Sequence, residues 1–441
     1  MSDEADAGEG LHIYLPRGAM KKINLYTYVA TAGLLVASLS TQAMAQNRDN
    51  NFSRDRSTSV EERARPEFTP LGLRAGSFVV TPVIGVGLGY KDNVYYTDTN
   101  KKSDAFLELT PGVVLTSDWG RHSLSLGAKS TVVQYASETN ENTAVLNLNA
   151  QGRLDISSAA SLAGNLSHET GYESRASFLA DPNARKPVKI TTTRAGLDLT
   201  LVGNRVRFIG SLNTEDESYD DVASLLGGTI PQGYRDMTGT TVSGRIDYAM
   251  SPSVSFFVYG ASNQRRYDIS SINDSDGAIF SVGTSFEIRS LSRGEIQIGT
   301  LAQDYKNQSV GKLTNTYYNG KLEWFPTELS TVTGKIGRQY SDTPSVGGSV
   351  SALASTAGIA VDHELLRNLI LSSDYEHASY EFNGIDRRDT RDTISIGARY
   401  LMNRRISLRA NVGHQKYDSS GAQAFRNYSD NSVRVALVLQ Y

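Results

Sequence analysis

Oppositely charged residues recur two positions apart along this chain. The pairs are Arg153 with Asp155, Arg245 with Asp247, Glu287 with Arg289 and Lys321 with Glu323, and Arg194 precedes Asp198 at a slightly longer spacing. Residues two apart on a β-strand lie on the same face, so the members of each close pair would share one wall of a sheet. A mixed-sign wall can select solutes in a pore, or its salt bridges can simply stiffen the wall. Both interpretations stay open.

Four further cations have no obvious partner nearby in the sequence. They are Lys129, Arg399, Arg409 and Arg434. In a water-filled lumen, such cations are candidates for attracting anionic solutes or sugars.

Tyrosines recur near the ends of alternate expected strands. Six of them are in phase with polar residues: Tyr135, Tyr219, Tyr267, Tyr305, Tyr380 and Tyr417. Tyr90 and Tyr172 are instead in phase with apolar residues. The series predicts either a girdle of rings at the membrane surface, with one β-bulge per strand correcting the phase, or a ring of phenols that stacks on sugars.

Residues for catalysis do not form a coherent set. The six histidines are scattered without the spacing of metal ligands. His168 beside Glu169 and His377 beside Glu376 resemble hydrolase dyads, but strand neighbours point to opposite faces. The chain has no cysteine, which excludes thiolate sites and disulfides. We therefore expect no enzyme activity, catalytic residue, metal or cofactor.

The elements that position these residues are long alternating strands. From Ser77 to Tyr441, segments of about 10–14 residues alternate apolar with polar or small side chains. In the stretch TISIGARYLM, for example, Ile394 and Ile396 alternate with Ser395 and Gly397. This alternation is typical of transmembrane strands with one face toward lipid and one toward a lumen.

The connections between these strands alternate between short and long. Short turns are expected near Trp119-Gly120, Ser157-Ser158, Gly203-Asn204, Ser251-Pro252, Ser292-Arg293, Pro326-Thr327, Leu366-Arg367 and Asn403-Arg404, and the longest loops at 174–187 and 220–236. The pattern predicts an all-β fold, a single transmembrane antiparallel β-barrel of about 18 strands (16–18), with short periplasmic turns and longer extracellular loops. About 16–18 strands leave a hydrated lumen.

The last strand has an apolar face that ends in an aromatic residue. Its outward residues are Val433, Val435, Leu437, Leu439 and Tyr441. A terminal aromatic on an alternating strand resembles the C-terminal signal read by the outer-membrane barrel assembly machinery. We expect this machinery and outer-membrane lipid as partners.

The chain begins with segments that are typical of export. Residues 20–45 have a basic start, an apolar stretch and Ala43-Met44-Ala45, which predicts a signal peptide cleaved between Ala45 and Gln46. Residues 1–19 are acidic and are expected to be an upstream extension. Residues 46–76 are polar and predict a periplasmic linker, mostly disordered up to about Arg65, before the barrel at 77–441.

Composition excludes several classes of protein. The net charge is −3, which gives no electrostatic case for nucleic acid as a partner. Mean hydropathy is −0.34 and 39% of residues are hydrophobic, which argues against a bundle of membrane-spanning helices.

The start of the barrel resembles a known family. Residues 65–96, with Pro66, Pro70, Gly72, Gly76-Ser77-Phe78, Pro82 and Asp92-Asn93-Val94, resemble the opening of a family of outer-membrane β-barrel porins often encoded with exopolysaccharide synthesis and export genes. The strand-end tyrosines and the last strand extend this resemblance over most of 65–441.

The resemblance implies polysaccharide passage. We therefore expect an integral outer-membrane protein that acts as a passive conduit for an exported polysaccharide, with periplasmic export components as further partners. A general or solute-specific diffusion porin and a non-transporting surface or adhesion barrel are the alternatives.

Overall fold

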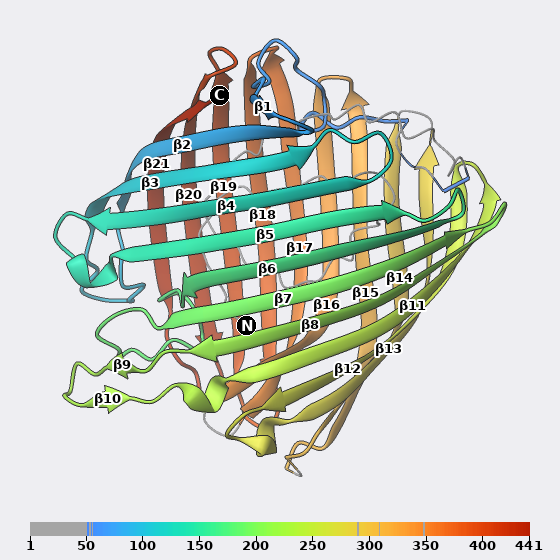
Figure 1. Cartoon of the computed structure of the whole chain (residues 1–441). Helices are drawn as coiled ribbons and strands as arrows, with labels where there is room; N and C mark the ends of the chain where they lie inside the picture. Colours follow the sequence, from blue (N-terminus) through green and yellow to red (C-terminus); the bar gives the residue numbers. More distant parts are fainter. Residues whose placement is uncertain (1–50, 53, 55, 289–290, 308, 347–348) are drawn as a thin grey trace.

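The computed structural model is an all-β protein (Figure 1). It describes residues 51–441 except 53, 55, 289–290, 308 and 347–348. The long strands are β2 (Phe78–Lys91), β3 (Asp104–Ser117), β4 (Ser123–Tyr135), β5 (Thr143–Asp155), β6 (Ala160–Tyr172), β7 (Lys189–Val202), β8 (Val206–Tyr219), β11 (Met237–Ser251), β12 (Val254–Tyr267), β13 (Ser275–Ile288), β14 (Ser292–Tyr305), β15 (Lys312–Thr327), β16 (Ser330–Val346), β17 (Ser349–Leu366), β18 (Leu369–Phe382), β19 (Arg388–Leu401), β20 (Ile406–Ser420) and β21 (Tyr428–Gln440). Short elements are β1 (Leu73–Ala75), β9 (Val222–Ala223), β10 (Thr229–Ile230) and the 3₁₀ turns η1 (Thr139–Glu141), η2 (Gly233–Arg235) and η3 (Ser271–Asn273).

The long strands close into a barrel. Each pairs antiparallel with its neighbours in the chain, and the first long strand, β2, also pairs with the last, β21, with Val83 opposite Gln440. Apart from the three-residue β1, the sheet contains 18 strands. The predicted fold class is thus confirmed.

Side-chain alternation gives the barrel its two faces. On β21 the residues of the expected apolar face, Val433, Val435, Leu437, Leu439 and Tyr441, are all exposed on the outer wall. Between them, Ala436 and Val438 are buried. The exposed apolar residues need lipid around them, because a soluble protein would leave this surface in water.

The short connections lie where the alternation predicts them, with two small shifts. Strand β14 already begins at Ser292, so the turn expected at Ser292-Arg293 precedes these residues. Pro326 and Thr327 still belong to β15, and the turn follows them. The two longest loops separate β6 from β7 and β8 from β11, as expected.

One ladder of the barrel stops early. Strands β15 and β16 pair from Thr327 opposite Ser330, at the short-turn end, to Asn319 opposite Gly337. Between their described residues, no pairing continues from this row toward the long-loop end. On the other side of β16, pairing with β17 continues to Asp342 opposite Ser351. We call the interval between 312–318 of β15 and 338–346 of β16 the seam.

Among the residues that the structure describes, no helix is both long and apolar enough to cross a bilayer.

Candidate functional site

The barrel interior contains a cavity of about 280 Å³ that extends along β6–β8 and β11–β16. Its neutral hydrogen-bonding side chains include Asn165, Asn213, Thr241, Ser243, Tyr259, Asn263, Gln297, Tyr317 and Asn319. Its charged side chains are Arg194, Asp198, Glu215, Glu217, Arg235, Arg245, Arg265, Glu295, Arg338 and Asp342. The cavity is the candidate site because it is the hollow part of the lumen where polar groups of many strands converge.

Arg245 lies at the centre of a charge network on the cavity wall. Its guanidinium bonds Asp247 at 2.7 Å and Glu295 at 2.7 Å. Arg207 reaches the same Asp247 at 3.2 Å. Two arginines therefore face two carboxylates, and these charge-assisted bonds leave the network close to neutral.

Other charged residues singled out in the sequence also form ion pairs. Arg153 bonds Asp155 at 2.8 Å, and Lys321 bonds Glu323 at 2.8 Å. Glu323 also accepts from Arg293 at 2.5 Å. These bonds occupy both carboxylates.

Arg194, which the sequence analysis grouped with Asp198, pairs across the sheet with residues of β8. Arg194 bonds Glu215 of β8 at 2.9 Å. The register of β7 and β8 puts Glu215 directly opposite Arg194, whereas Asp198 is four residues, about 13 Å, farther along the strand. For the other expected pair, Glu287 accepts a hydrogen bond from the Ser57 backbone N–H at 2.6 Å, and Arg289 lies outside the described residues.

The four cations without a sequence-local partner all have partners in the folded chain. Arg399 bonds Glu61 at 2.7 Å, and Arg434 bonds Glu108. Lys129 on β4 and Arg409 on β20 also take part in interactions. None of the four is an isolated positive charge in the lumen.

Tyrosines at the long-loop end surround buried carboxylates. The hydroxyls of Tyr267 and Tyr305 donate to Asp342 at 3.0 and 3.1 Å, and Arg265 pairs with the same carboxylate. Because Asp342 belongs to β16 while its donors belong to β12 and β14, the outer part of β16 turns into the lumen. Tyr340, only 1% exposed, packs there against Leu301 and Leu353.

Tyr417 and Tyr219 bond acidic residues in the same way. The Tyr417 hydroxyl donates to Asp389, which also pairs with Arg387 at 2.5 Å. The Tyr219 hydroxyl donates to Glu217 at 3.2 Å. These phenols therefore serve the barrel's own hydrogen bonding.

The remaining tyrosines of the series also point inward. Tyr380 is buried under the loop between β6 and β7, and Tyr135 packs against the buried ring of Phe106 at 5.5 Å. Tyr90, by contrast, is exposed on the outer wall. At the short-turn end the outer wall carries other aromatic side chains: Trp119, Tyr248, Phe256, Trp324, Tyr400 and Tyr441. The six polar-phase tyrosines are thus not the outer girdle.

The loop between β6 and β7, residues 173–188, folds over the lumen; we call it the inward loop. Near its own strands it is fixed by two buried ion pairs, Glu173 with Arg235 at 2.6 Å and Arg175 with Glu141 at 2.7 Å. Burial alone would lower the pKa of Arg235, but the Glu173 carboxylate raises this pKa above its ordinary value. The anchor therefore stays charged.

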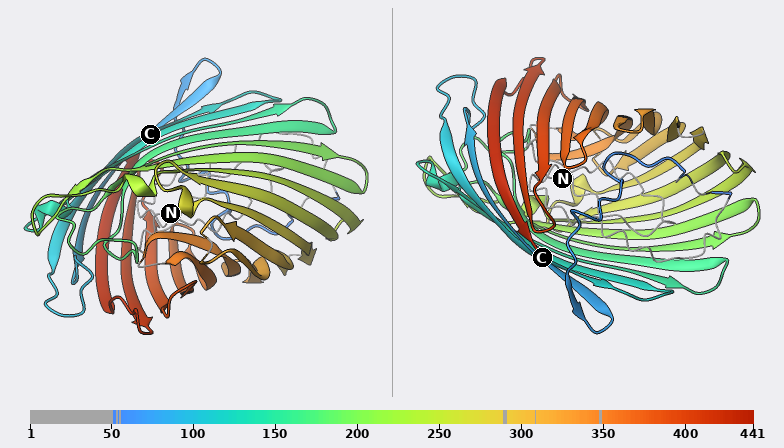
Figure 2. Two further views of the ribbon diagram at one scale, coloured as in Figure 1. Left: turned by 90° about the horizontal axis from the view of Figure 1, so that it is seen from below. Right: turned by 90° about the horizontal axis from the view of Figure 1, so that it is seen from above.

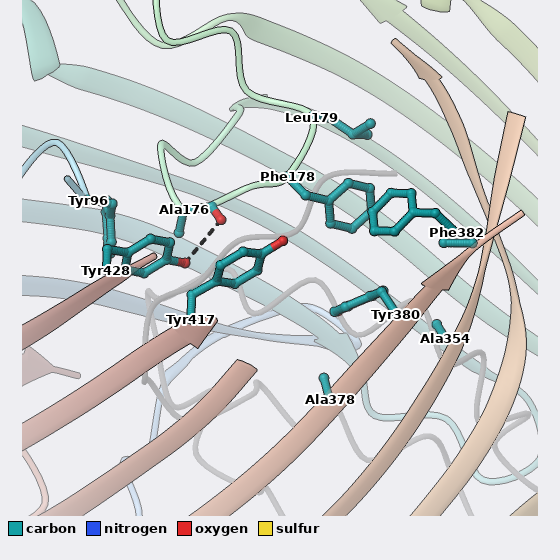
Figure 3. Packing of buried hydrophobic residues seen from close by; sticks show 11 residues of the cluster. Tyr96, Ala176, Phe178, Leu179, Ala354, Ala378, Tyr380, Phe382, Tyr417 and Tyr428 are labelled. Atoms are coloured by element: carbon teal, nitrogen blue, oxygen red, sulfur yellow. Dashed lines mark hydrogen bonds between the residues drawn. The ribbon is translucent and has the colours of Figure 1, made fainter. Parts of the chain in front are cut away.

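The tip of the inward loop packs against distant strands (Figure 3). The Phe178 ring lies 5.1 Å from that of Tyr380 and 5.4 Å from that of Phe382 on β18. The Tyr428 hydroxyl of β21 donates to the Ala176 carbonyl at 3.1 Å. The loop therefore spans the long-loop end of the lumen and narrows it.

An N-terminal segment, residues 51–67 without 53 and 55, crosses the opposite end (Figure 2). The Phe52 ring lies 4.6 Å from the Arg207 guanidinium, and the Val60 N–H donates to Thr331 at 2.9 Å. Farther along, Arg65 bonds Glu364 of β17 at 2.8 Å.

These contacts correct the expectation of a free linker. The described residues of the segment form no regular secondary structure, but their side chains bond strands from β8 to β19 at the short-turn end. Several of its charged residues form ion pairs with wall residues hundreds of positions away in the chain. The predicted cleavage position, Ala45 and Gln46, lies outside the described residues.

The histidines within the described range have single polar partners. His377 bonds Asp392 at 2.8 Å, and His168 lies 3.0 Å from Thr193. No group of three or more metal-ligating side chains occurs among the described residues.

The sequence reading missed Asp342 and Asp389 as centres of hydrogen bonding. A signal was available, since most tyrosines of the series are followed within two residues by a polar or acidic residue, as in Tyr340 and Asp342. The tyrosines that donate to these carboxylates belong to other strands, so the sequence around each aspartate does not identify them.

Comparisons with known proteins agree with this architecture. Residues 65–441 match the family model described as "Putative beta-barrel porin 2". No curated protein matches the chain in sequence.

Several solved structures have a similar barrel. One is the outer membrane protein OpdK from Pseudomonas aeruginosa, with 10% identity, 82% of this chain and 99% of that chain covered, and a TM-score of 0.42. Another is a BenF-like porin from Pseudomonas fluorescens Pf-5, with 9% identity, coverage of 82% and 99%, and a TM-score of 0.44. The siderophore receptor PirA from Acinetobacter baumannii has 6% identity, coverage of 82% and 80%, and a TM-score of 0.43.

Proposed function

Because this chain belongs to the beta-barrel porin 2 family, it is an outer-membrane porin barrel, and we propose that it is a diffusion channel for small uncharged polar solutes such as mono- and disaccharides. It belongs to a family of porins, not of enzymes.

The observation that carries this proposal is the set of neutral hydrogen-bonding side chains of the cavity named above, from Asn165 to Asn319, which we call the neutral belt. Most of the charges beside it form ion pairs, as in the Arg245 network. Amide and hydroxyl groups remain, and each both donates and accepts hydrogen bonds, as sugar hydroxyls require. Tyr259 and Tyr317 add half-exposed rings for the apolar faces of sugar rings.

Swelling of liposomes that contain the full chain tests this function. We expect glucose and maltose to enter, while bilayer recordings give similar permeabilities for potassium and chloride. Strong selectivity for one ion, or no entry of glucose, would contradict the proposal. As a matched variant, Gln297→Glu adds a charge to the belt and is expected to shift selectivity toward cations.

Export of a polysaccharide is the second candidate. It is favoured by the same lining, since amides and phenols also suit a sugar polymer, but the inward loop and the N-terminal segment would both have to move aside. Loss of surface polysaccharide with periplasmic accumulation after gene deletion would support it. Unchanged secretion would contradict it.

We also propose that residues 20–45 direct export and are cleaved after Ala45, and that the apolar face ending at Tyr441 serves recognition by the assembly machinery. Mass spectrometry of the mature N-terminus tests the first point. Tyr441→Ser, expected to lower the amount of folded protein in the membrane, tests the second.

A further inference from the structure

The outer wall has a groove directly below the seam. It has a volume of about 390 Å³ and is lined by residues of β14–β18. Leu322, Ile336 and Ile359 form its apolar walls. Gly334 lies at its base and leaves space there, since no atom lies within 4 Å of the position that a Cβ would take. At roughly 30 Å³ per water-sized group, this space accommodates about a dozen methylene groups, the size of one acyl chain.

The groove lies at the upper edge of the barrel's apolar band. On β15 the outward residues change from Trp324, Leu322 and Tyr318 to Thr316 and Thr314. Lipid headgroups meet a barrel at this boundary. A chain in the groove would therefore have its polar head beside the seam.

Arg338 occupies this position at the seam. It follows Ile336 on the same face of β16, its Nε donates to the Ser355 hydroxyl at 3.0 Å, and its guanidinium lies 5.6 Å from the centroid of the Tyr318 ring. A guanidinium at headgroup level favours an anionic head.

The lining of the interior cavity extends up to the seam. Arg338 and its neighbour Gln339 both line the interior cavity, although consecutive residues of a strand point to opposite faces. At these two residues the cavity lining reaches the seam, where the described residues of β15 and β16 are not paired with each other. Free strand edges at membrane depth require protein or water beside them, so a polar headgroup or water fits there better than a hydrocarbon chain.

We propose that the groove and the seam form a lateral binding site for a single-chain fatty acid, whose chain lies over Gly334 and whose carboxylate bonds Arg338. The volume suits one chain rather than the two or more of a membrane lipid. The groove lies on the outer wall, apart from the proposed passage of sugars, whereas Arg338 also lines the cavity.

Photolabelling of the full chain in phosphatidylethanolamine and phosphatidylglycerol liposomes tests the site. A dodecanoic acid that carries a diazirine is expected to label β15–β17 saturably, and excess dodecanoic acid should compete. Phosphatidylglycerol with the same photoreactive chain should label the wall weakly and without saturation. Equal, saturable labelling by the phospholipid, or labelling spread evenly around the barrel, would overturn the proposal.

Matched variants locate the two parts of the site. Gly334→Leu should abolish saturable labelling, whereas Gly260→Leu, another outer-wall glycine with nothing within 4 Å of a Cβ, should not. Arg338→Gln should weaken dodecanoic acid binding about tenfold, a loss of one charge-assisted bond. Arg266→Gln, at an exposed outer-wall pair with Asp276, should leave binding unchanged.

Heat-modifiable migration on gels confirms that each variant is folded. Sugar entry should be unchanged in Gly334→Leu, so failure of the lipid site and failure of the proposed channel give different results. Unaltered labelling of folded Gly334→Leu would show that the groove does not hold the chain.

Discussion

Single carboxylates organise the long-loop end of this barrel. Asp342 accepts from two tyrosine hydroxyls and one arginine, all from strands other than its own. Such a buried group contributes most when every bond is made, because an unmet partner keeps its full desolvation penalty. The paired tyrosine and acid residues thus hold the turned-in part of β16 in place.

Replacing Asp342 with asparagine should destabilise the barrel, because Arg265 would lose its counter-charge in a buried position. We expect a loss of about 3 kcal/mol in unfolding free energy. Urea unfolding in lipid vesicles measures it. Asp276→Asn, in the exposed pair with Arg266, is the control and should cost less than about 1 kcal/mol. Equal losses of unfolding free energy in the two variants would contradict the stabilising role of Asp342.

Acid pH should release the loop between β2 and β3. The Tyr95 hydroxyl, which donates to Glu138 at 2.7 Å, and then Lys102 hold the pKa of Glu138 below its usual value. A lowered carboxyl pKa means that the stabilisation is complete above the ordinary glutamate pKa and is lost as pH falls through the lowered one.

The chain has no cysteine, so a thiol-reactive dye attached to the variant Asp98→Cys labels only the loop between β2 and β3. Its anisotropy should fall on acidification in the parent and change much less in Glu138→Gln. Identical pH curves would contradict the role of Glu138.

Among the elements, the inward loop decides how wide the long-loop end is. Its anchors are ion pairs beside its own strands, and its tip packs by aromatic contacts on β18. The sequence indicated only that the loop at 174–187 is long and polar. Its fold over the lumen depends on Phe178 meeting Tyr380 and Phe382, which are about two hundred residues away in the chain.

Phe178→Ala should loosen the inward loop and raise single-channel conductance. Truncating a buried phenylalanine costs about 3–5 kcal/mol, enough to release a loop tip that depends on it. Planar bilayer recordings measure the change. Leu226→Ala, at a loop residue that is 83% exposed, should leave conductance unchanged. If neither variant changes conductance, the loop does not limit flow.

In the whole molecule, the two ends of the lumen are narrowed by different parts of the chain. The inward loop spans one end, and the N-terminal segment crosses the other through bonds to the walls. Between them lies the neutral belt of the cavity. The barrel wall therefore sets the width of the lumen, whereas the inward loop and the N-terminal segment set the width of its two openings.

Deleting residues 51–64 should at least double the single-channel conductance, because the short-turn end would open. Bilayer recordings of the deleted and full chains give the comparison. The ion pair of Glu61 and Arg399 offers a control. Glu61→Arg and Arg399→Glu should each raise the conductance, because each breaks this pair. The double variant, in which the two charges are exchanged, should restore the conductance of the parent. A deletion without effect would show that the segment leaves the passage open.

The strands of this protein are readable in its sequence because each transmembrane strand alternates lipid-facing and lumen-facing residues with a period of two. That alternation predicts the all-β class, the strand number, the turns and the outward face of β21. It also predicts which charges share a wall, since Arg153 and Asp155 are close on one strand.

Contacts between distant strands had no such local trace. The partner of Arg194 depends on register across β7 and β8, and the partners of Arg399 and Asp342 depend on how the closed wall and the inward segments meet. Hence Tyr267, Tyr305 and Tyr417, open to two interpretations in the sequence, face inward and bond carboxylates, because barrel closure brings acidic residues of other strands to their hydroxyls.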